Sequence, residues 1–190
     1  SLQWTGSRTQ PTDVYGPDGT AALVQGALAF IRANADVRSV DEGRATRPET
    51  LFHGHDLAAT VAPAQGFKDD KVTVTTVENT HFPDRAKAKM PYRSIAYRFD
   101  TADRSIVISG DTAYSKNLVE LAKGVDLFVC EVIDTAIWED MMARAKAQRW
   151  LPLLAPTRYV AVDIAREAVA QTLARMAPEF PRTEMIGVVS

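Results

Sequence analysis

Apolar and polar residues alternate along Lys71–Val77, which is the period of a strand with one buried face. The runs Ser94–Phe99 and Ser105–Ser109 are rich in β-branched and aromatic residues, and the turn Asp100–Asp103 separates them, which predicts a β-hairpin. The run Asp126–Ile133 is almost continuously apolar and predicts a strand buried on both faces. Together these segments predict one β-sheet.

Helical periodicity alternates with these strands. The turn Gly16–Gly19 follows a short β segment and precedes a predicted helix over Ala21–Ala33, for which Thr20 is the expected N-cap. Residues 36–56 are polar and predict irregular structure, and Leu57–Val61 predicts a short strand. Three further helices are predicted over Leu118–Ala122, Thr135–Gln148 and Val160–Met176. The pattern is that of an α/β protein.

Composition narrows the class of protein. The chain has 190 residues, enough for one domain with a hydrophobic core, and a net charge of −2, which gives no signal for a nucleic-acid or membrane partner. The single cysteine, Cys130, lies in an apolar run and is expected to be a buried hydrophobe. No membrane-spanning stretch or signal peptide is visible, which favours a cytoplasmic location; a periplasmic one would require a signal peptide upstream of Ser1.

Two side chains stand where chemistry is expected in an α/β protein. Asp111 follows the strand Ser105–Ser109 and His81 follows the strand Lys71–Val77, and ligands gather at the carboxyl ends of such strands. Imidazole and carboxylate groups both suit divalent metals. The alternative interpretations are an Asx turn or helix cap at Asp111 and a loop histidine with one hydrogen bond at His81.

The order of these segments resembles the metallo-β-lactamase superfamily, in particular its ribonuclease Z-like and arylsulfatase-like branch. The matching segments, in chain order, are Val14–Thr20 (VYGPDGT), Asn79–His81 (NTH), Ser94–Phe99 (SIAYRF), Ile106–Thr112 (IVISGDT) and Val129–Val132 (VCEV). The resemblance covers roughly residues 1–142, and the strand that leads into Ser-Gly-Asp-Thr is its most specific part.

The resemblance implies an α/β fold, an incomplete αββα sandwich of the metallo-β-lactamase type. It also implies two metal ions, zinc in the first place with manganese or iron as alternatives, which activate a water for attack on a phosphodiester or aryl sulfate. It assigns a metal-binding role to His81 and to Asp111, the latter as the carboxylate that bridges both ions. Ser109, Gly110 and Thr112 would then shape the loop that orients Asp111.

The histidines depart from the superfamily pattern. The motif His-x-His-x-Asp-His, expected before the Tyr-Gly-Pro segment, does not occur in these 190 residues, and no histidine follows His81. The segment His53-Gly54-His55-Asp56 lacks the last histidine and follows the wrong segment, so it is interpreted as an unrelated loop, with an opportunistic metal site as the alternative. We therefore expect one domain truncated at its N-terminus, with a divergent helical part over residues 148–190.

His81 and Asp111 alone are too few ligands for a stable two-metal site. Two functions are consistent with the sequence: a metal-dependent ester hydrolase represented by an incomplete chain, or a non-catalytic superfamily remnant that binds a partner or oligomerises. Missing strands would leave a sheet edge uncovered, which predicts a homo-oligomer.

Two further groups of charged residues have two interpretations each. Glu131 and Asp134 follow a buried strand and either orient metal ligands or serve as caps. Four basic residues after His81 either bind an anionic substrate or form a solvated loop: Arg85, Lys87, Lys89 and Arg93.

Overall fold

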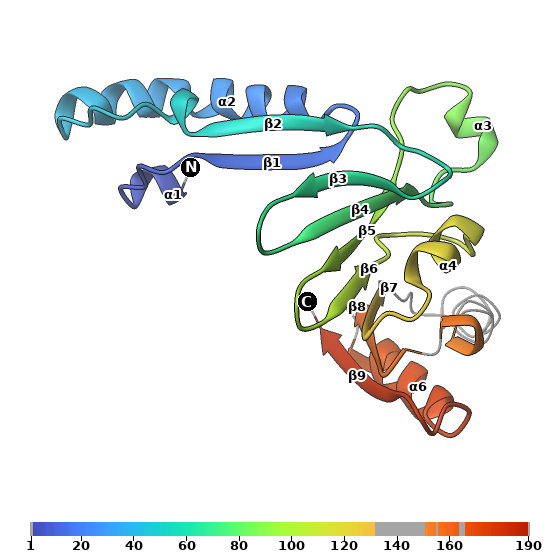
Figure 1. Cartoon of the computed structure of the whole chain (residues 1–190). Helices are drawn as coiled ribbons and strands as arrows, with labels where there is room; N and C mark the ends of the chain where they lie inside the picture. The colour runs from blue at the N-terminus through green and yellow to red at the C-terminus, as the bar shows by residue number, and fades with distance from the viewer. Residues whose placement is uncertain (1, 132–150, 155, 164–165, 190) are drawn as a thin grey trace. The chain divides into compact units, whose positions relative to one another are not determined.

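The chain forms two compact units, Ser1–Ala58 and Ala59–Ser190, in a computed structural model (Figure 1). The structure describes residues 2–131, 151–154, 156–163 and 166–189. The predicted helix over Thr135–Gln148 lies outside the described residues. None of the described helices is long and apolar enough to cross a membrane.

The first unit is built around a β-α-β element. Its elements are α1 (Leu2–Thr5), β1 (Thr12–Pro17), α2 (Thr20–Asp41), the 3₁₀ helix η1 (Pro48–Thr50) and β2 (Phe52–Leu57). Strands β1 and β2 pair in parallel, with Asp13 beside His53 and Tyr15 beside His55. Trp4, Ala35 and Leu51 form a small buried cluster at one end of this unit.

Helix α2 begins and ends differently from the prediction. Thr20 is the first helical residue, and Gly19, in the left-handed conformation with φ of 100°, holds the N-cap position. The Thr20 hydroxyl donates to the Pro17 carbonyl at 2.7 Å. This side chain therefore stabilises the turn and does not cap the helix. The helix continues past Ala33 to Asp41, since no proline or glycine interrupts that stretch.

The segment His53–Asp56 is part of strand β2, so its interpretation as a loop was wrong. Gly54 lies against α2, where a Cβ atom would stand 2.7 Å from the Ala21 Cα atom. Asp56 Oδ1 accepts a hydrogen bond from the Ala21 backbone N–H at 2.9 Å, at the start of α2. Two of the four residues in this segment therefore hold strand and helix together.

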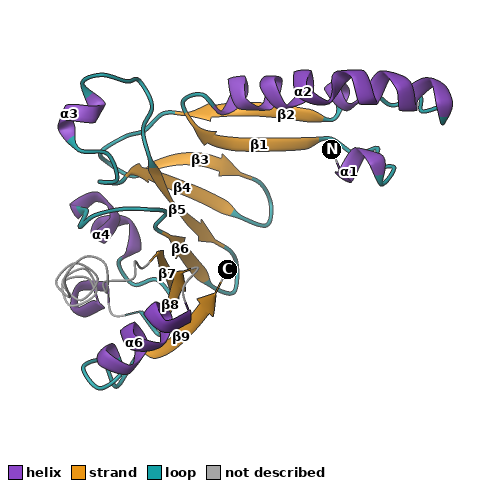
Figure 2. Ribbon diagram, turned by 180° about the vertical axis from the view of Figure 1, so that it is seen from behind, coloured by secondary structure: helices purple, strands orange, loops and turns teal. Residues whose placement is uncertain are grey.

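The second unit contains a seven-stranded mixed sheet whose strands lie in chain order (Figure 2). The strands are β3 (Ala64–Lys68), β4 (Thr73–Glu78), β5 (Ile95–Asp100), β6 (Ser105–Ile108), β7 (Leu127–Glu131), β8 (Arg158–Asp163) and β9 (Glu184–Val189). Pairing is antiparallel from β3 to β6 and parallel from β6 to β9. The predicted hairpin of β5 and β6 is confirmed.

The described helices of this unit are α3 (Asp84–Lys87), α4 (Lys116–Ala122) and α6 (Arg166–Met176). One face of the sheet forms the core with α4 and α6, and it contributes Val77, Ala96, Val107 and Phe128. Strand β7 alternates between buried Phe128 and Cys130 and half-buried neighbours, so the prediction of a strand buried on both faces was wrong. Cys130 is buried, as expected.

The C-terminal part contains strands that the helical pattern concealed. Residues 158–163 form β8, and the helix predicted over Val160–Met176 begins only at Arg166. Val162 is β-branched and suits a strand, but it also stands three residues before Ala165 and seven before Val169, which is the spacing of one helical face, so spacing alone could not separate the two. Strand β3 was also missed, because a register shift between Gln65 and Phe67 interrupts its alternation.

Asp126 joins the starts of β6 and β7, and its role predicts a pH dependence of stability. Its carboxylate accepts hydrogen bonds from the Ser105 backbone N–H at 2.7 Å and from the Ser105 hydroxyl at 2.9 Å. These hydrogen bonds lower the pKa of Asp126 below its usual value. The stabilisation is therefore present above the ordinary aspartate pKa of about 3.9 and is lost as the pH falls through the lowered value.

Wild-type protein and the Asp126→Asn variant should be compared by urea unfolding from about pH 7 to about pH 3. We expect the wild type to be more stable at neutral pH and the difference to shrink at the acid end. A difference that stays constant with pH would contradict the assignment.

Candidate functional site

The Ser109–Thr112 segment lies at the carboxyl end of β6. The Ser109 backbone N–H donates to the Val129 carbonyl at 3.0 Å, which extends the pairing with β7 by one residue. Gly110 adopts φ of 62°, a left-handed conformation that favours glycine. This turn directs the chain away from the strand, and the following residue, Asp111, is exposed.

The segment that contains His81 lies directly beside this turn. Asn79, only 2% exposed, donates from Nδ2 to the Ser109 carbonyl at 2.9 Å and accepts at Oδ1 from the His81 backbone N–H at 3.1 Å. The Thr80 backbone N–H donates to the Thr112 hydroxyl at 3.0 Å, and the Thr80 carbonyl accepts from the Ala113 N–H at 3.3 Å. The loops after β4 and β6 are thus hydrogen-bonded neighbours.

Sequence reasoning chose His81 and Asp111 but overlooked Asn79 as the residue that organises their loops. Thr112 accepts the Thr80 hydrogen bond, and Ser109 supplies the carbonyl for Asn79, so both take part in joining the loops. The signal for Asn79 was its position directly after a strand, since a buried amide there can bind backbone groups of a neighbouring loop. In the sequence alone, however, nothing distinguishes this asparagine from any other that follows a strand.

His81 and Asp111 are both exposed at this end of the sheet, and the His81 ring packs edge-on against Phe82 with ring centroids 4.6 Å apart. Among the residues that the structure describes, no group of three or more His, Cys, Asp or Glu side chains could hold a metal ion. The described residues thus offer ligands of suitable chemistry on adjacent loops but do not complete a metal site. Their assignment as metal ligands stays a prediction.

The charged residues near this site are partly engaged. Lys87 Nζ lies 2.6 Å from Glu78 Oε1, and Arg93 Nε lies 3.9 Å from the same oxygen. Arg85 and Lys89 are exposed on and beside α3. Glu131 is half-buried at the end of β7, whereas Asp134 lies outside the described residues. Two of the four basic residues thus pair with a carboxylate of the sheet.

His55 and His53 lie in the first unit and share a neighbour. Asp13 Oδ1 is 2.6 Å from His55 Nε2 and 3.8 Å from His53 Nδ1, and the His55 ring stacks on Tyr15 with centroids 4.6 Å apart. These contacts join β1 to β2. They explain both histidines as cross-strand partners on the surface of this unit.

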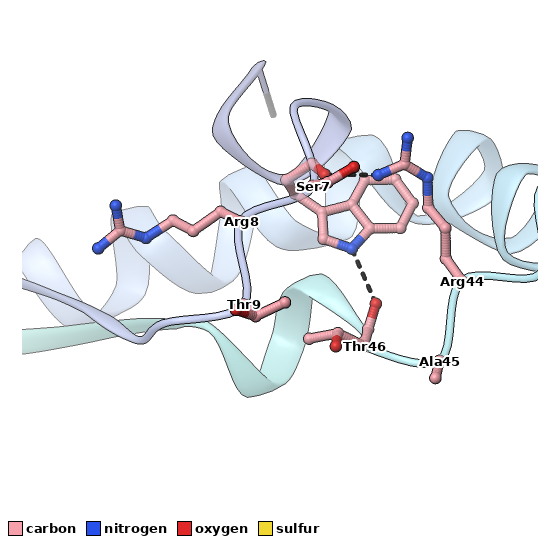
Figure 3. Close-up of a pocket in the computed structure, with 7 residues that line it drawn as sticks. Ser7, Arg8, Thr9, Arg44, Ala45 and Thr46 are labelled. Carbon is pink, nitrogen blue, oxygen red and sulfur yellow. Dashed lines mark hydrogen bonds between the residues drawn. The ribbon is translucent and has the colours of Figure 1, made fainter.

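Two hollows lie away from the candidate site. One, of about 160 Å³, is formed in the first unit around Trp4, where the Arg44 guanidinium lies over the indole and donates to the Trp4 carbonyl at 2.7 Å (Figure 3). The other, of about 460 Å³, lies at the starts of β7, β8 and β9, where Arg158 pairs with Glu184. Neither lies at the carboxyl strand ends where α/β sites gather.

A model of the β-lactamase superfamily domain matches residues 5–180, which is most of the chain and spans both units. The chain belongs to the metallo-β-lactamase superfamily. Its α/β fold agrees with that membership, as the resemblance implied. Zinc is the metal typical of this superfamily.

Relatives within the superfamily include ribonuclease Z enzymes. The chain is 30% identical over 139 residues to ribonuclease Z of Mycobacterium sp. strain KMS, covering 73% of this chain and 43% of that protein. It is 27% identical to ribonuclease Z of Mycobacterium tuberculosis strain H37Rv, covering 73% of this chain and 45% of that protein. The chain therefore spans less than half the length of these relatives.

Solved structures agree on the fold. The metallo-β-lactamase fold protein YhfI from Bacillus subtilis matches with a TM-score of 0.62 and 16% identity, covering all of this chain and 68% of that one. Human tRNase Z, short form, matches with a TM-score of 0.52 and 20% identity, covering 80% of this chain and 60% of that one. At these identities the likeness concerns fold alone.

Proposed function

We propose that this chain is part of a metal-dependent hydrolase that cleaves an ester of the phosphodiester or aryl sulfate type. The observation that carries the proposal is the pair of hydrogen-bonded loops after β4 and β6, which present His81 and Asp111 at the same end of the sheet. The distant relationship to ribonuclease Z supports a phosphodiester as substrate.

In this proposal His81 and Asp111 are the chain's contribution to a metal centre. A histidine nitrogen and a carboxylate suit zinc, manganese and iron, and a bound metal would supply a water with a lowered pKa. The described residues do not complete the ligand set, so the remaining ligands would come from residues other than these. The side chains of the chain itself position the two ligands: Asn79 and Thr112 fix the loops that carry them.

Metal binding and hydrolysis test the proposal together. Metal-free protein should be titrated with Zn²⁺ or Mn²⁺ and assayed on bis(4-nitrophenyl) phosphate and 4-nitrophenyl sulfate. We expect metal-dependent hydrolysis of one of these esters, lowered at least about 100-fold by His81→Ala and by Asp111→Asn, because a direct ligand should matter at least as much as an outer-shell partner. Bound metal is measured in the same samples.

His53→Ala is the matched control, since His53 is an exposed histidine of the first unit. It should leave metal content and hydrolysis unchanged. Hydrolysis that survives both site substitutions, or that His53→Ala abolishes equally, would contradict the proposal.

The second candidate is a non-catalytic superfamily remnant that acts as a binding or oligomerising module. It is favoured by the ligand count, because the described residues hold no group of three metal-binding side chains. This candidate would be supported over the hydrolase by protein that retains neither zinc nor manganese and whose metal content and hydrolysis are the same after Asp111→Ala.

A further inference from the structure

Helix α2 carries an exposed apolar seam on the side away from its own core. Leu23, Phe30, Val37 and Val40 are 69%, 89%, 66% and 87% exposed, although they are large hydrophobic residues. With the exposed small residues Gly26 and Ala33 they form an unbroken heptad pattern: Leu23, Phe30 and Val37 at positions a, and Gly26, Ala33 and Val40 at positions d. This spacing is that of a coiled-coil seam.

The seam is separate from the face that holds α2 in its unit. The buried residues of the helix are Val24, Leu28 and Ala35, each one or two positions after a seam residue and therefore on a different side. Gly26 has open space around it, since a Cβ atom there would meet no heavy atom within 4 Å. The fold of the first unit thus needs neither the exposed apolar residues nor the glycine.

We infer that α2 pairs in antiparallel orientation with α2 of a second copy of this chain. In an antiparallel coiled coil each a position faces a d position, so Phe30 lies opposite the partner's Ala33 and Val37 opposite the partner's Gly26. Leu23 then lies opposite the partner's Val40. Every layer combines a larger and a smaller side chain, so the seam is complementary to itself over its whole length.

Charge favours the antiparallel orientation over the parallel one. Asp36 and Asp41 flank the seam at positions g and e, and a parallel pair would place Asp41 of one helix beside the Asp36–Arg47 ion pair of the other, with two carboxylates on the same side. In the antiparallel pair both carboxylates lie along the partner's first half of α2, which carries no charged residue from Thr20 to Ile31. The parallel arrangement would also set glycine against glycine and leave a gap.

The size of the seam sets the strength of the dimer. It runs from Leu23 to Val40, about 26 Å along the helix. One pair of helices of this length buries less than the roughly 1,200 Å² typical of stable interfaces. We therefore expect a weak, reversible homodimer in exchange with the monomer.

Sedimentation velocity from about 1 µM to about 300 µM tests the association. The wild-type chain should shift from monomer to dimer, and Phe30→Asp should raise the dissociation constant at least about 100-fold, because each dimer would bury two charges at its centre. Val61→Asp is the control: Val61 is an apolar residue of the second unit, 71% exposed, and its substitution should leave the dimer unchanged. Circular dichroism should be the same for all three proteins.

Cross-linking with a short bismaleimide tests the orientation. Leu23→Cys mixed with Val40→Cys should cross-link, whereas Leu23→Cys alone should not, because antiparallel pairing separates the two copies of residue 23 by about 25 Å. Cys130 is 2% exposed and contributes no background in the folded protein. Cross-linking of Leu23→Cys with itself would overturn the antiparallel pairing.

A chain that stays monomeric at every concentration would overturn the inference, and so would a dimer that Phe30→Asp does not weaken. The first result would indicate that the seam does not bind a second copy of itself. The second would indicate that another surface makes the dimer. Both readouts are independent of metal and of hydrolysis.

Discussion

Replacing Asn79 by alanine is expected to lower the free energy of unfolding by about 2–3 kcal/mol. The side chain is buried and supplies one donor and one acceptor, to the Ser109 carbonyl and the His81 N–H. Alanine removes both hydrogen bonds and leaves buried backbone groups to find other partners, which is the costly case. Urea unfolding followed by far-UV circular dichroism measures the loss.

Hydrogen exchange adds a local readout to this prediction. The amides of Thr80 and Ala113 join the two loops, and both should exchange faster in Asn79→Ala. Asn117→Ala is the matched control, because Asn117 is half-buried and donates a single hydrogen bond to the Glu78 carbonyl at 3.0 Å. A loss for Asn79→Ala no larger than that for Asn117→Ala would show that Asn79 does not organise the loops.

Replacing Phe128 by alanine should cost about 3–5 kcal/mol, the largest effect expected in the second unit. The ring is fully buried at the centre of the sheet, between the strands and the helices α4 and α6, and its centroid lies 6.2 Å from that of Tyr159. Truncation loses the transfer free energy of the ring and leaves a cavity that the sheet cannot close. The same urea measurement detects it.

Tyr92→Ala provides the comparison, since Tyr92 is an aromatic residue with 54% exposure outside the sheet. Its removal should change the free energy of unfolding by less than about 0.5 kcal/mol. If Phe128→Ala were tolerated as well as Tyr92→Ala, the core would have to lie elsewhere than on this face of the sheet.

Strands with short-range signals were predictable. β4, β5 and β6 each pair with an antiparallel neighbour. Each also shows alternating, β-branched or aromatic residues within a few consecutive positions. β8 was mistaken for helix because a parallel strand pairs with residues far away in the chain, here with β7 and β9. Its consecutive apolar residues are consistent with the period of a helix as well as with a strand.

From residue types alone, the candidate site was predictable only at its ligands. His81 and Asp111 are residue types that bind metals, and both follow recognisable strands, so their positions drew attention. Thr112 was assigned a part in shaping the loop only through the family resemblance, and Asn79 was not recognised, because a side-chain amide has a function only through the backbone group that it meets. That group belongs to another loop, some 30 residues away in the case of Asn79.

The heptad of α2 illustrates the same division. Its apolar spacing is present in the sequence, but one stripe of a helix could equally be the face that packs on its own sheet. Only the tertiary structure shows that Val24, Leu28 and Ala35 take that place and leave Phe30 in solvent. Whether an apolar residue of a helix is buried or exposed depends on which side of the helix the rest of the chain packs against.

The sequence by itself determined the superfamily, the α/β class and the strand-end position of Asp111 in Ser109–Thr112, since these follow from local order along the chain. The tertiary structure decided that the loops of His81 and Asp111 are neighbours and that the His53–Asp56 segment is a strand. It decided as well which face of α2 is free. All three depend on contacts between residues distant in sequence, and such contacts form only when the chain has packed.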